Sequence, residues 1–489
     1  MGIAPQRIGG CAVTWACRRE AWYRRCMTRL KTSVVVVLVC TAKVAWAETP
    51  TAAERDALRA VYKELVEIDT THANGSTTRA AQAMAARLRA AGFAPDDVVI
   101  VGDQPTKQNL VARLHGSGAQ RPLLLLAHLD VVEARRDDWS MDPFVLTERD
   151  GFFYGRGTLD DKAMAAIFVR LLVQMKETGA TPNRDIILAL TADEEGGPDN
   201  GVAWLLQHRR DLVDAEYVVN EGGGGRMRGG KYLANTVQAS EKTYMNFAFE
   251  VRDKGGHSSL PTKENAIYRL AHGLARLEKY QFPVELNDVT RAFFARSAAA
   301  ERGQTAADMR AILRTPPDAT AAARLSATPA YNATLRTTCV ATRLEGGHAD
   351  NALPQLARAL VNCRAMPGHG ADDIRAALVR VVADERIAVT VVDPGIAGPN
   401  SPLDPHLMDA VERVSAALWP GLPVVPLMST GASDSRYFRL AGIPAYGVSG
   451  IFVDIDDVRA HGRDERLGVP QFYEGYDFLS RLVATLAGL

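Results

Sequence analysis

Five short segments carry side chains that could bind metal ions. They are Ala-His-Leu-Asp at 127–130, Gly-Arg-Gly-Thr-Leu-Asp-Asp-Lys at 155–162, Asp-Glu-Glu-Gly-Gly at 193–197, Asn-Glu-Gly-Gly at 220–223 and Ala-His-Gly at 460–462. Each places a His or a carboxylate beside glycine or at the end of a hydrophobic run. Together they supply two His and at least four carboxylates, a ligand set that suits zinc. The pattern predicts a hydrolase that uses two metal ions.

The first of these segments follows an apolar run at 123–127, which is typical of a central strand in an α/β sheet. Ligand sites in such sheets lie at the carboxyl ends of the strands. Because residues i and i+2 of an extended chain point the same way, we expect Asp130 to accept a hydrogen bond from the second ring nitrogen of a metal-bound His128. Taken alone, this pair would also fit a core histidine paired with a carboxylate.

Two further acidic segments follow strand-like runs. Glu194 and Glu195 come after the run 186–190, and Glu221 comes after 217–220. Neighbouring side chains point in different directions, so one of the paired glutamates could bind metal while the other acts as a general base. An ordinary acidic loop would have the same composition. The glycines after Glu221 are not followed by Gly-Lys-Ser/Thr, which excludes a P-loop.

The acids at 160 and 161 stand in a glycine-flanked turn before a helix that should begin at Lys162. Asp161 fits the N-cap of that helix. His257 and His461 lie in glycine-rich loops, where a histidine is better placed for function than for packing.

Composition sets the size and excludes one class of partner. With 489 residues and 47 % hydrophobic content, the chain is long enough for two globular domains. The formal net charge is zero, but residues 1–47 contain eight Lys/Arg and one Glu, so the remainder is acidic. An acidic chain lacks the basic footprint that nucleic-acid binding needs.

The basic N-terminus has the pattern of a secretory signal peptide. Arg29 and Lys31 precede the apolar run 34–42, and Ala45-Trp46-Ala47 fits a cleavage site before Glu48. Residues 1–26 would then be an upstream extension, since Met27 is a more ordinary start. The apolar run is much shorter than the roughly 20 residues that span a bilayer. We therefore expect a periplasmic or secreted protein, cut between Ala47 and Glu48, with no stable membrane span after cleavage.

Four of the six cysteines lie in the first 40 residues and would be removed with the signal peptide. Cys339 and Cys363 remain, both in strand-like stretches. In an exported protein they could form a disulfide, and buried free thiols are an equal alternative.

The order of elements predicts two domains, one inserted into the other. Strand-like and helical runs alternate from residue 48 to 241 and again from 401 to 489. Between them, residues 242–400 have the order β-α-β-β-α-β of a ferredoxin-like domain, interrupted by an Ala-rich stretch at about 281–330 that is typical of a helical insertion. The role of this insertion cannot be deduced from its sequence.

The combined motifs resemble a family of hydrolases with two co-catalytic zinc ions, which contains aminoacylase, succinyl-diaminopimelate desuccinylase and glutamate carboxypeptidase. His128-Leu-Asp-Val-Val132, Trp139-x-x-x-Pro143-Phe144, Phe153-Tyr-Gly-Arg-Gly157 and Asp193-Glu-Glu-Gly-Gly197 are most similar to its carboxypeptidase S branch. The resemblance covers the whole chain after the signal peptide. It implies an α/β fold, with a zinc-peptidase catalytic domain and an inserted ferredoxin-like α+β lid or dimerisation domain.

The resemblance also implies a role for each candidate residue. It makes Glu194 the general base, Asp130 the partner of His128, and His257 the oxyanion-stabilising residue, in many members from the partner subunit of a homodimer. The implied ligands of two zinc ions, with cobalt or manganese as substitutes, are His128, Asp160, Glu195, Glu221 and His461. Asn351, Arg364, Gly431 and Ser433 match contacts to the substrate carboxylate. A cis peptide between Asp160 and Asp161 is implied too, and Asn220 departs from the aspartate found in many relatives.

These observations predict an exported zinc amidohydrolase or metallopeptidase. Its substrate would be a small peptide, cleaved next to its C-terminal residue, or an N-acyl amino acid. One alternative is a catalytically silent relative that binds peptides, against which the complete ligand set and Glu194 argue. Another is a serine hydrolase, for which Gly447-Val-Ser-Gly450 is only a fragment of the required Gly-x-Ser-x-Gly turn. The preferred acyl group or side chain, the physiological metal and the oligomeric state are left open.

Overall fold

The computed structural model describes residues 50–489. The predicted signal peptide, with its cleavage site between Ala47 and Glu48, lies outside the described residues. Within residues 50–489, no helix is both long and apolar enough to cross a membrane.

The first part of the chain alternates helices and strands much as the sequence predicts. Its elements are α1 (Ala52–Glu67), α2 (Thr77–Ala90), β1 (Val98–Val101), β2 (Asn109–Leu114), β3 (Leu123–His128), β4 (Thr147–Arg149), β5 (Phe152–Tyr154), α3 (Lys162–Glu177), β6 (Ile186–Thr191), α4 (Gly201–His208), α5 (Arg210–Val213), β7 (Tyr217–Asn220), β8 (Gly225–Arg228) and β9 (Lys231–Glu241). Two 3-10 turns, η1 (Pro95–Asp97) and η2 (Arg136–Asp138), lie between them.

The last part of the chain returns to the same sheet. It contains α12 (Pro405–Leu418), β16 (Val424–Ser429), α13 (Ser435–Leu440), β17 (Ala445–Gly447), β18 (Phe452–Asp454), β19 (Arg466–Gly468) and α14 (Val469–Leu486). Strands from both parts form one mixed sheet of ten strands, in the order β1-β2-β6-β3-β7-β17-β9-β8-β18, with β16 paired to β9. Strands β6, β3 and β7 are parallel neighbours at its centre.

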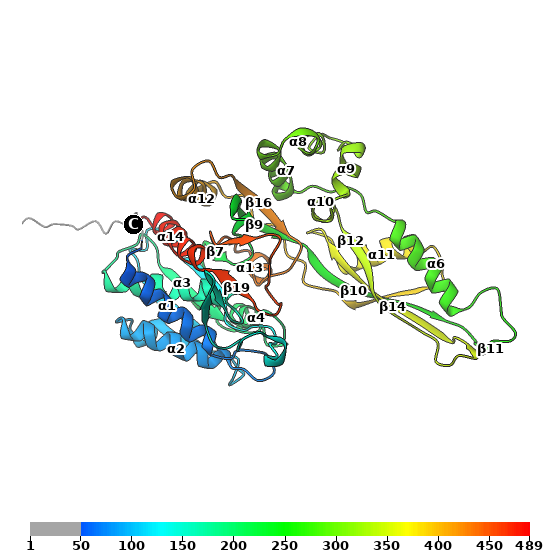
Figure 1. The fold of residues 1–489 in the computed structure, drawn as a ribbon, viewed down its shortest axis with the longest axis horizontal. Coiled ribbons are helices and arrows are strands. Elements are labelled where there is room, and N and C mark those ends of the chain that lie inside the picture. Colours follow the sequence, from blue (N-terminus) through cyan, green and yellow to red (C-terminus); the bar gives the residue numbers. More distant parts are fainter. Residues whose placement is uncertain (1–49) are drawn as a thin grey trace, which may run out of the picture. The chain divides into compact units, whose positions relative to one another are not determined.

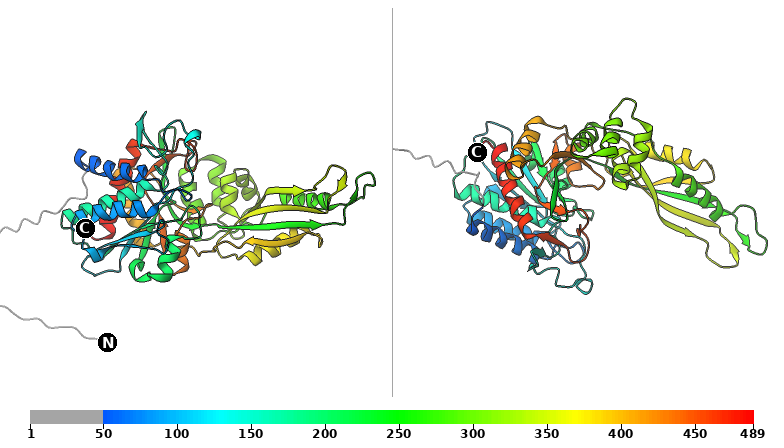
Figure 2. Two further views of the ribbon diagram at one scale, coloured as in Figure 1. Left: turned by 90° about the horizontal axis from the view of Figure 1, so that it is seen from below. Right: turned by 45° about the horizontal axis from the view of Figure 1, so that its top comes forward.

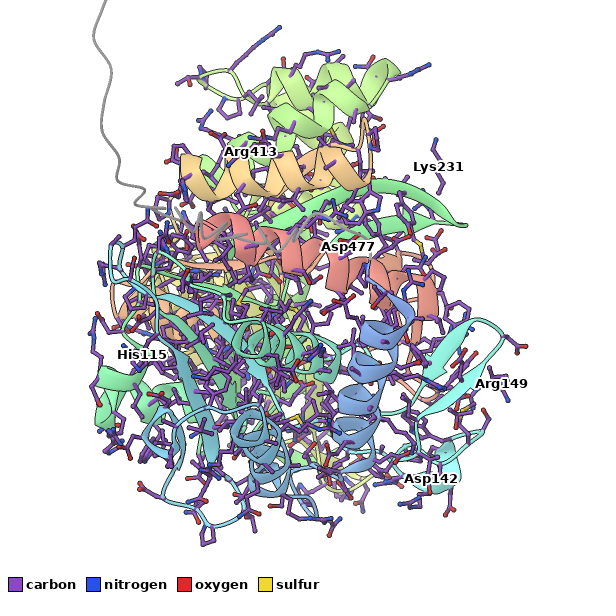
Figure 3. The ribbon with its side chains drawn as sticks, turned by 90° about the vertical axis from the view of Figure 1, so that its left-hand side faces the viewer. His115, Asp142, Arg149, Lys231, Arg413 and Asp477 are labelled. Carbon is purple, nitrogen blue, oxygen red and sulfur yellow. A yellow bond between two sulfur atoms is a disulfide. The ribbon has the colours of Figure 1, made fainter. Side chains whose placement is uncertain are left out.

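Helices cover both faces of this sheet (Figure 1). Leu123, Leu125 and Ala127 of β3 face a core formed with α1, α2, α3, α12 and α14. Leu124 and Leu126 face the opposite core, formed with α4, α5 and α13. Both faces of β3 are therefore buried, which explains why its sequence is an unbroken apolar run. Figure 3 shows α12 and α14, marked by Arg413 and Asp477, side by side on the first of these cores.

The segment between β9 and α12 forms a separate antiparallel sheet. Its elements are β10 (Thr243–Arg252), β11 (Gly256–His257), α6 (Ala266–Lys279), β12 (Thr338–Gly346), β13 (Ala352–Leu353), β14 (Leu356–Ala365), α11 (Ala371–Val382) and β15 (Ala388–Asp393). The strand order β12-β14-β10-β15 is that of a ferredoxin-like sheet, and α6 and α11 pack on one face of it (Figure 2). The predicted fold class is confirmed.

The Ala-rich stretch folds as four helices with a small core of their own. They are α7 (Asp288–Ala300), α8 (Gly303–Ala311), α9 (Ala319–Ser326) and α10 (Pro329–Leu335). Phe294, Met309, Ile312, Leu325 and Leu335 fill the core between them. Strand β12 begins at Thr338, shortly after α10 ends at Leu335.

The two remaining cysteines form a disulfide. Cys339 on β12 and Cys363 on β14 are paired residues of neighbouring strands, and a disulfide joins their sulfur atoms. Of the two alternatives left open by the sequence, the structure has the disulfide.

Candidate metal-dependent active site

The candidate metal ligands gather at one edge of the large sheet. His128 is the last residue of β3, Glu194 and Glu195 follow β6, and Glu221 follows β7. These three strands are parallel and adjacent, so their carboxyl ends meet at the same edge. The sequence order of the segments therefore becomes a spatial cluster.

Two loops complete the cluster. Asp160 lies in the turn before α3, and its carboxylate is 3.0 Å from His128 Nε2 and 3.2 Å from His461 Nε2. His461 lies in the loop between β18 and β19 with φ +63°, and its Nε2 is 2.8 Å from Glu195 Oε1. Asp160 thus lies between the two imidazoles, as expected of a ligand shared by two ions. The peptide between Asp160 and Asp161 is cis.

The ligand atoms converge in two overlapping groups. One contains His128, Asp160 and Glu195, and the other contains His128, Glu194 and Glu221; within each group the atoms lie within 4.8 Å of one another. Glu194 therefore points into the cluster beside His128 and Glu221.

The electrostatics of the cluster fit bound cations. Burial, followed by the charges of Asp160 and Glu194, raises the pKa of Glu221 well above its usual range. Burial and the nearby Asp434 do the same to the pKa of Glu194. Hydrogen bonds to Asp160 and Glu195 raise the pKa of His461 to about 10. Crowded carboxylates and imidazoles of this kind are an appropriate donor set for metal dications, which replace the protons.

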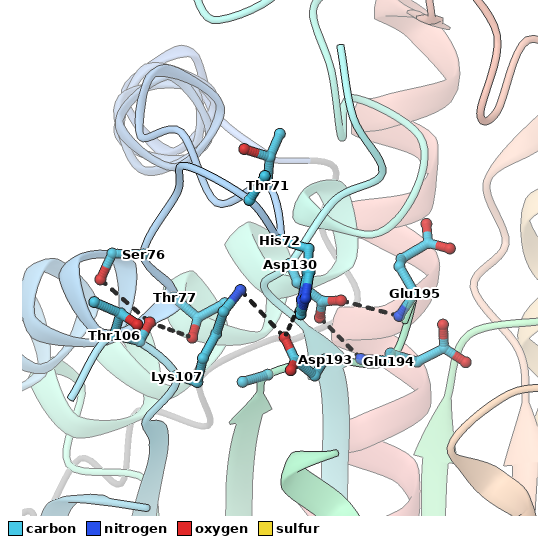
Figure 4. A network of polar contacts seen from close by, with 12 residues as sticks. Thr71, His72, Ser76, Thr77, Thr106, Lys107, Asp130, Asp193, Glu194 and Glu195 are labelled. Atoms are coloured by element: carbon cyan, nitrogen blue, oxygen red, sulfur yellow. Dashed lines mark hydrogen bonds and ion pairs between the residues drawn. The ribbon is translucent and has the colours of Figure 1, made fainter. Parts of the chain in front are cut away.

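The histidine on β3 is held differently from the prediction. His128 Nδ1 is 3.0 Å from the backbone carbonyl of Asp130, and 3.7 Å from its carboxylate. The Asp130 carboxylate instead accepts hydrogen bonds from the backbone N–H groups of Glu194, at 3.1 Å, and Glu195, at 2.9 Å (Figure 4). The Asp130 carboxylate therefore binds the backbone that follows β6 and holds the paired glutamates.

Asp161 occupies the N-cap position of α3, but its side chain makes no capping hydrogen bond. It is 2 % exposed, and burial raises its carboxyl pKa well above the usual range. Asp161 therefore stands at the predicted N-cap position, but its side chain is buried and does not cap the helix.

One buried residue that the sequence analysis missed supports the Asp160 turn. Glu465 Oε1 accepts hydrogen bonds from the backbone N–H groups of Leu159 and Asp160, at 2.8 and 3.2 Å. Its Oε2 accepts from Arg156 at 2.6 Å and from the N–H of Gly157 at 3.2 Å. A single acid in a loop four residues after His461 gives no sequence signal of this role.

A cavity of about 450 Å³ adjoins Glu194, Glu195 and His461. Arg364 of β14 and Gly431 line it, as predicted for substrate contacts. The Arg364 guanidinium lies 4.7 Å from the centre of the Tyr244 ring and donates to the backbone carbonyl of Thr430 at 3.2 Å. It is thus oriented by its neighbours before any substrate binds. Other lining residues that sequence reasoning missed are Glu241, Lys242, Tyr244 and Arg436.

Three predicted residues lie elsewhere. Ser433 is buried, and both its N–H and its hydroxyl donate to Glu241, at 2.9 and 3.0 Å. His257 and Asn351 are exposed neighbours, connected by the pairing of β11 with β13 and by the hydrogen bond from Ser258 N–H to the Asn351 carbonyl at 3.0 Å. Among residues 50–489, neither is part of the cavity lining. Figure 1 shows β11 beyond the ends of β10 and β14, far from β16.

Asn220 and Ser449, which the sequence analysis also singled out, make structural hydrogen bonds. The amide of Asn220 donates to Ser435 Oγ at 3.0 Å and ties the end of β7 to α13. Ser449 is buried, its hydroxyl donates to the carbonyl of Gly223 at 3.1 Å, and strand β18 follows it. Since a nucleophilic serine needs an exposed turn before a helix, the serine-hydrolase alternative is wrong.

The fold and this site are those of a metal-dependent peptidase or amidohydrolase. Residues 124–485 match the family described as peptidase family M20/M25/M40, and the chain belongs to that family.

Individual proteins that are similar to this chain support the family assignment. The chain is 30% identical over 374 residues to a human protein named N-fatty-acyl-amino acid synthase/hydrolase PM20D1, covering 74% of each chain. It is 26% identical over 378 residues to the probable carboxypeptidase S-like 2 of Dictyostelium discoideum, covering 74% of this chain and 71% of that one. Among solved structures, the M20 family metallo-carboxypeptidase Sso-CP2 of Sulfolobus solfataricus shares the fold, with a TM-score of 0.67 at 16% identity, over 88% of this chain and 99% of that one.

The support of the Asp160 turn by Glu465 leads to a prediction. Glu465→Gln would place an amide opposite four donor groups that now bind a carboxylate, so the Asp160 turn should lose its fixed position. We expect metal affinity to fall by roughly 10–100-fold, as is typical when a partner of a metal ligand is removed. Titration of the metal-free protein against a competing chelator measures this. Glu474→Gln is the matched control, because Glu474 binds a tyrosine hydroxyl instead. Equal affinities of both variants would contradict the assignment.

Proposed function

We propose that the protein is an exported di-zinc amidohydrolase that removes the C-terminal residue of short peptides or hydrolyses N-acyl amino acids. The observation that carries this proposal is the convergence of His128, Asp160, Glu195 and His461 beside Glu194, at the wall of a cavity that also contains Arg364. In this proposal, the hydrolytic centre and the Arg364 guanidinium, which would bind a carboxylate, therefore share one cavity.

We assign one zinc ion to His128, Asp160 and Glu221, and the other to Asp160, Glu195 and His461. Bound there, two zinc ions would lower the pKa of a water molecule and polarise the scissile carbonyl. Cobalt and manganese have compatible ligand preferences and could substitute.

The residues of the chain then divide the remaining work. The carboxylate of Glu194 takes a proton from the attacking water. Glu194 has this role because, in our assignment, it is the acid of the cluster that does not bind a metal ion. It then gives the proton to the leaving nitrogen, which departs as an amine while the acyl carbon becomes a carboxylate. Asp130 fixes the backbone of Glu194, so that the carboxylate stays directed at the reacting atoms.

Arg364 would bind the free carboxylate of the substrate. Its guanidinium is preoriented by Tyr244 and Thr430, which leaves part of its fork for a ligand. Both proposed substrate classes carry a free carboxylate next to the amide that is cleaved. The names of two relatives, an N-fatty-acyl-amino acid synthase/hydrolase and a probable carboxypeptidase S-like protein, fit this requirement.

We also propose that the protein acts as a homodimer in which His257 and Asn351 serve the partner subunit. Strand β12 lies at the edge of its sheet, with Val340 59% and Leu344 67% exposed. An apolar groove of about 850 Å³ runs between β12 and α6. Pairing of two β12 edge strands would cover the groove. Without such pairing, the hydrophobic edge strand would stay exposed.

Export is supported by two observations. Residues 1–47 have the pattern of a cleaved signal peptide, and the Cys339–Cys363 disulfide suits an oxidising compartment.

The role of Glu194 is tested by Glu194→Gln. We expect zinc content to stay near two per chain, because the other ligands remain, while kcat falls by several orders of magnitude with the loss of the proton carrier. Elemental analysis and steady-state kinetics on N-acyl amino acids and dipeptides measure both. Loss of one metal ion with the activity would instead make Glu194 a ligand.

The role of Arg364 is tested by comparing acids with amides. Hydrogen bonds to charged groups contribute about 1.5–3 kcal/mol, so Arg364→Ala should lower kcat/KM at least roughly tenfold for N-acyl amino acids. The corresponding C-terminal amides should lose much less. Arg358→Ala is the matched control on the same strand, since Arg358 is exposed and does not line the cavity. Equal losses for acids and amides would make Arg364 structural.

The dimer is tested by mixing inactive chains. A His257→Ala chain mixed with a Glu194→Ala chain should regain up to about a quarter of the wild-type activity, because exchanged dimers contain one intact site. Subunit exchange is followed by native mass spectrometry. Two chains that exchange without recovering activity would place the function of His257 within its own subunit.

A further inference from the structure

The residue before the paired glutamates, Asp193, has no role in the metal site described above, yet it is fully buried. Its side chain is 0% exposed, and its backbone has φ +55°, in the left-handed region that is uncommon for residues other than glycine. This conformation sends the Asp193 side chain away from Glu194 and Glu195, into the protein interior.

A buried lysine meets this carboxylate. Lys107 Nζ lies 3.2 Å from Asp193 Oδ1, and the Lys107 side chain is 8% exposed. Within residues 50–489, neither Lys107 Nζ nor either carboxylate oxygen of Asp193 has a hydrogen-bond partner of good geometry. The contact is therefore mainly an attraction between opposite charges. His72 Nδ1 is at 3.7 Å and lies on the solvent side.

The glutamate turn is consequently held from two sides (Figure 4). On one side, Asp130 accepts the N–H groups of Glu194 and Glu195. On the other, Asn200 donates to the Asp193 carbonyl at 3.2 Å. A Cβ at Gly197 would lie 2.4 Å from Asp193 Oδ2, so the turn is also closely packed around this carboxylate.

Lys107 is itself firmly placed. It lies in the connection between β1 and β2, and the carbonyl of the preceding residue, Thr106, accepts hydrogen bonds from the Thr78 N–H and from the hydroxyls of Ser76 and Thr77, each at 3.3 Å. These three residues form the start of α2. The lysine is thus anchored to an element that takes no part in metal binding.

Charge explains why a lysine is needed there. The Asp193 carboxylate is fully buried, and an unpaired buried carboxylate is strongly unfavourable. Without the cation, the Asp193 carboxylate would be driven toward water, and that change would move the backbone that carries Glu194.

We propose that Lys107 is a positioning residue for the Glu194–Glu195 turn, which it holds through its ion contact with Asp193. The consequence for turnover rests on the proposed role of Glu194 as proton carrier. The consequence for the turn itself does not depend on that role.

The test compares Lys107→Met, Lys107→Arg and the double variant Lys107→Met/Asp193→Asn. Lys176→Met is the matched control, a half-buried lysine on α3 that lies over the Phe93 ring. Each variant is examined for zinc content, for kcat and KM on an N-acyl amino acid, and for hydrogen exchange of residues 192–199 in the metal-free protein.

In Lys107→Met we expect kcat to fall by about 30-fold or more while KM changes less than about threefold, because the base is misplaced and the carboxylate site is not. Zinc should remain near two per chain, and exchange of residues 192–199 should accelerate by about tenfold or more. Lys107→Arg, which keeps the charge, should stay within about fivefold of wild-type kcat, and the double variant, which removes both charges, should recover about fivefold or more over Lys107→Met. Lys176→Met should match the wild type. Should Lys107→Met not fold, Lys107→Gln carries the same expectations.

Three results would overturn the proposal. They are unchanged exchange of residues 192–199 in Lys107→Met, a double variant no better than the single one, and a loss of zinc in proportion to the loss of kcat. A wild-type protein that hydrolyses no N-acyl amino acid or dipeptide would refute the proposed function alone, because the exchange measurement would still decide the role of Lys107.

Discussion

The site depends on one electrostatic constraint, the crowding of carboxylates at the ends of three parallel strands. Asp160, Glu194, Glu195 and Glu221 come together around His128 and His461. The raised pKa values of Glu194 and Glu221 express the cost of this crowding. Such an arrangement is stable only with cations or protons between the acids, and metal dications satisfy it while leaving the histidines neutral as ligands.

The loops that carry the crowded carboxylates must be held in place, and buried acids hold them mostly by accepting hydrogen bonds from backbone N–H groups. Glu465 accepts those of the Asp160 turn, and Asp130 accepts those of the Glu194 turn. An acid that binds backbone donors fixes a loop without competing for the metal, because its oxygens are already engaged. The supporting acids therefore orient the ligands without adding free carboxylates to the cluster.

The sequence predicted the strands, and the gathering of the candidate ligands at one edge of the sheet, because both depend on local patterns. A run such as 123–127 is apolar on both faces only in a central strand, and parallel strands must place their carboxyl ends together. The supports were not predictable in the same way. Glu465 is distant in sequence from the turn it binds, and the Asp130 carboxylate, expected to pair with His128, instead binds the backbone N–H groups of Glu194 and Glu195. Contacts between residues so far apart in the sequence produce no periodic pattern from which they could be predicted.

The separation of Arg364 from His257 bears on how specificity could arise. Arg364 and Glu194 share one cavity, so in the proposed mechanism a single chain would hold the substrate carboxylate near Glu194. His257 instead lies on an exposed two-stranded turn, where it contacts Ser259. In the proposed dimer, the edge strand β12 and its apolar groove would bring the partner's copy of this turn to the site. One subunit would then bind the substrate carboxylate, and the other would stabilise the charge that develops on the carbonyl oxygen. Selection for an amide adjacent to a terminal carboxylate would follow from the distance between these two contributions, more than from the shape of either one.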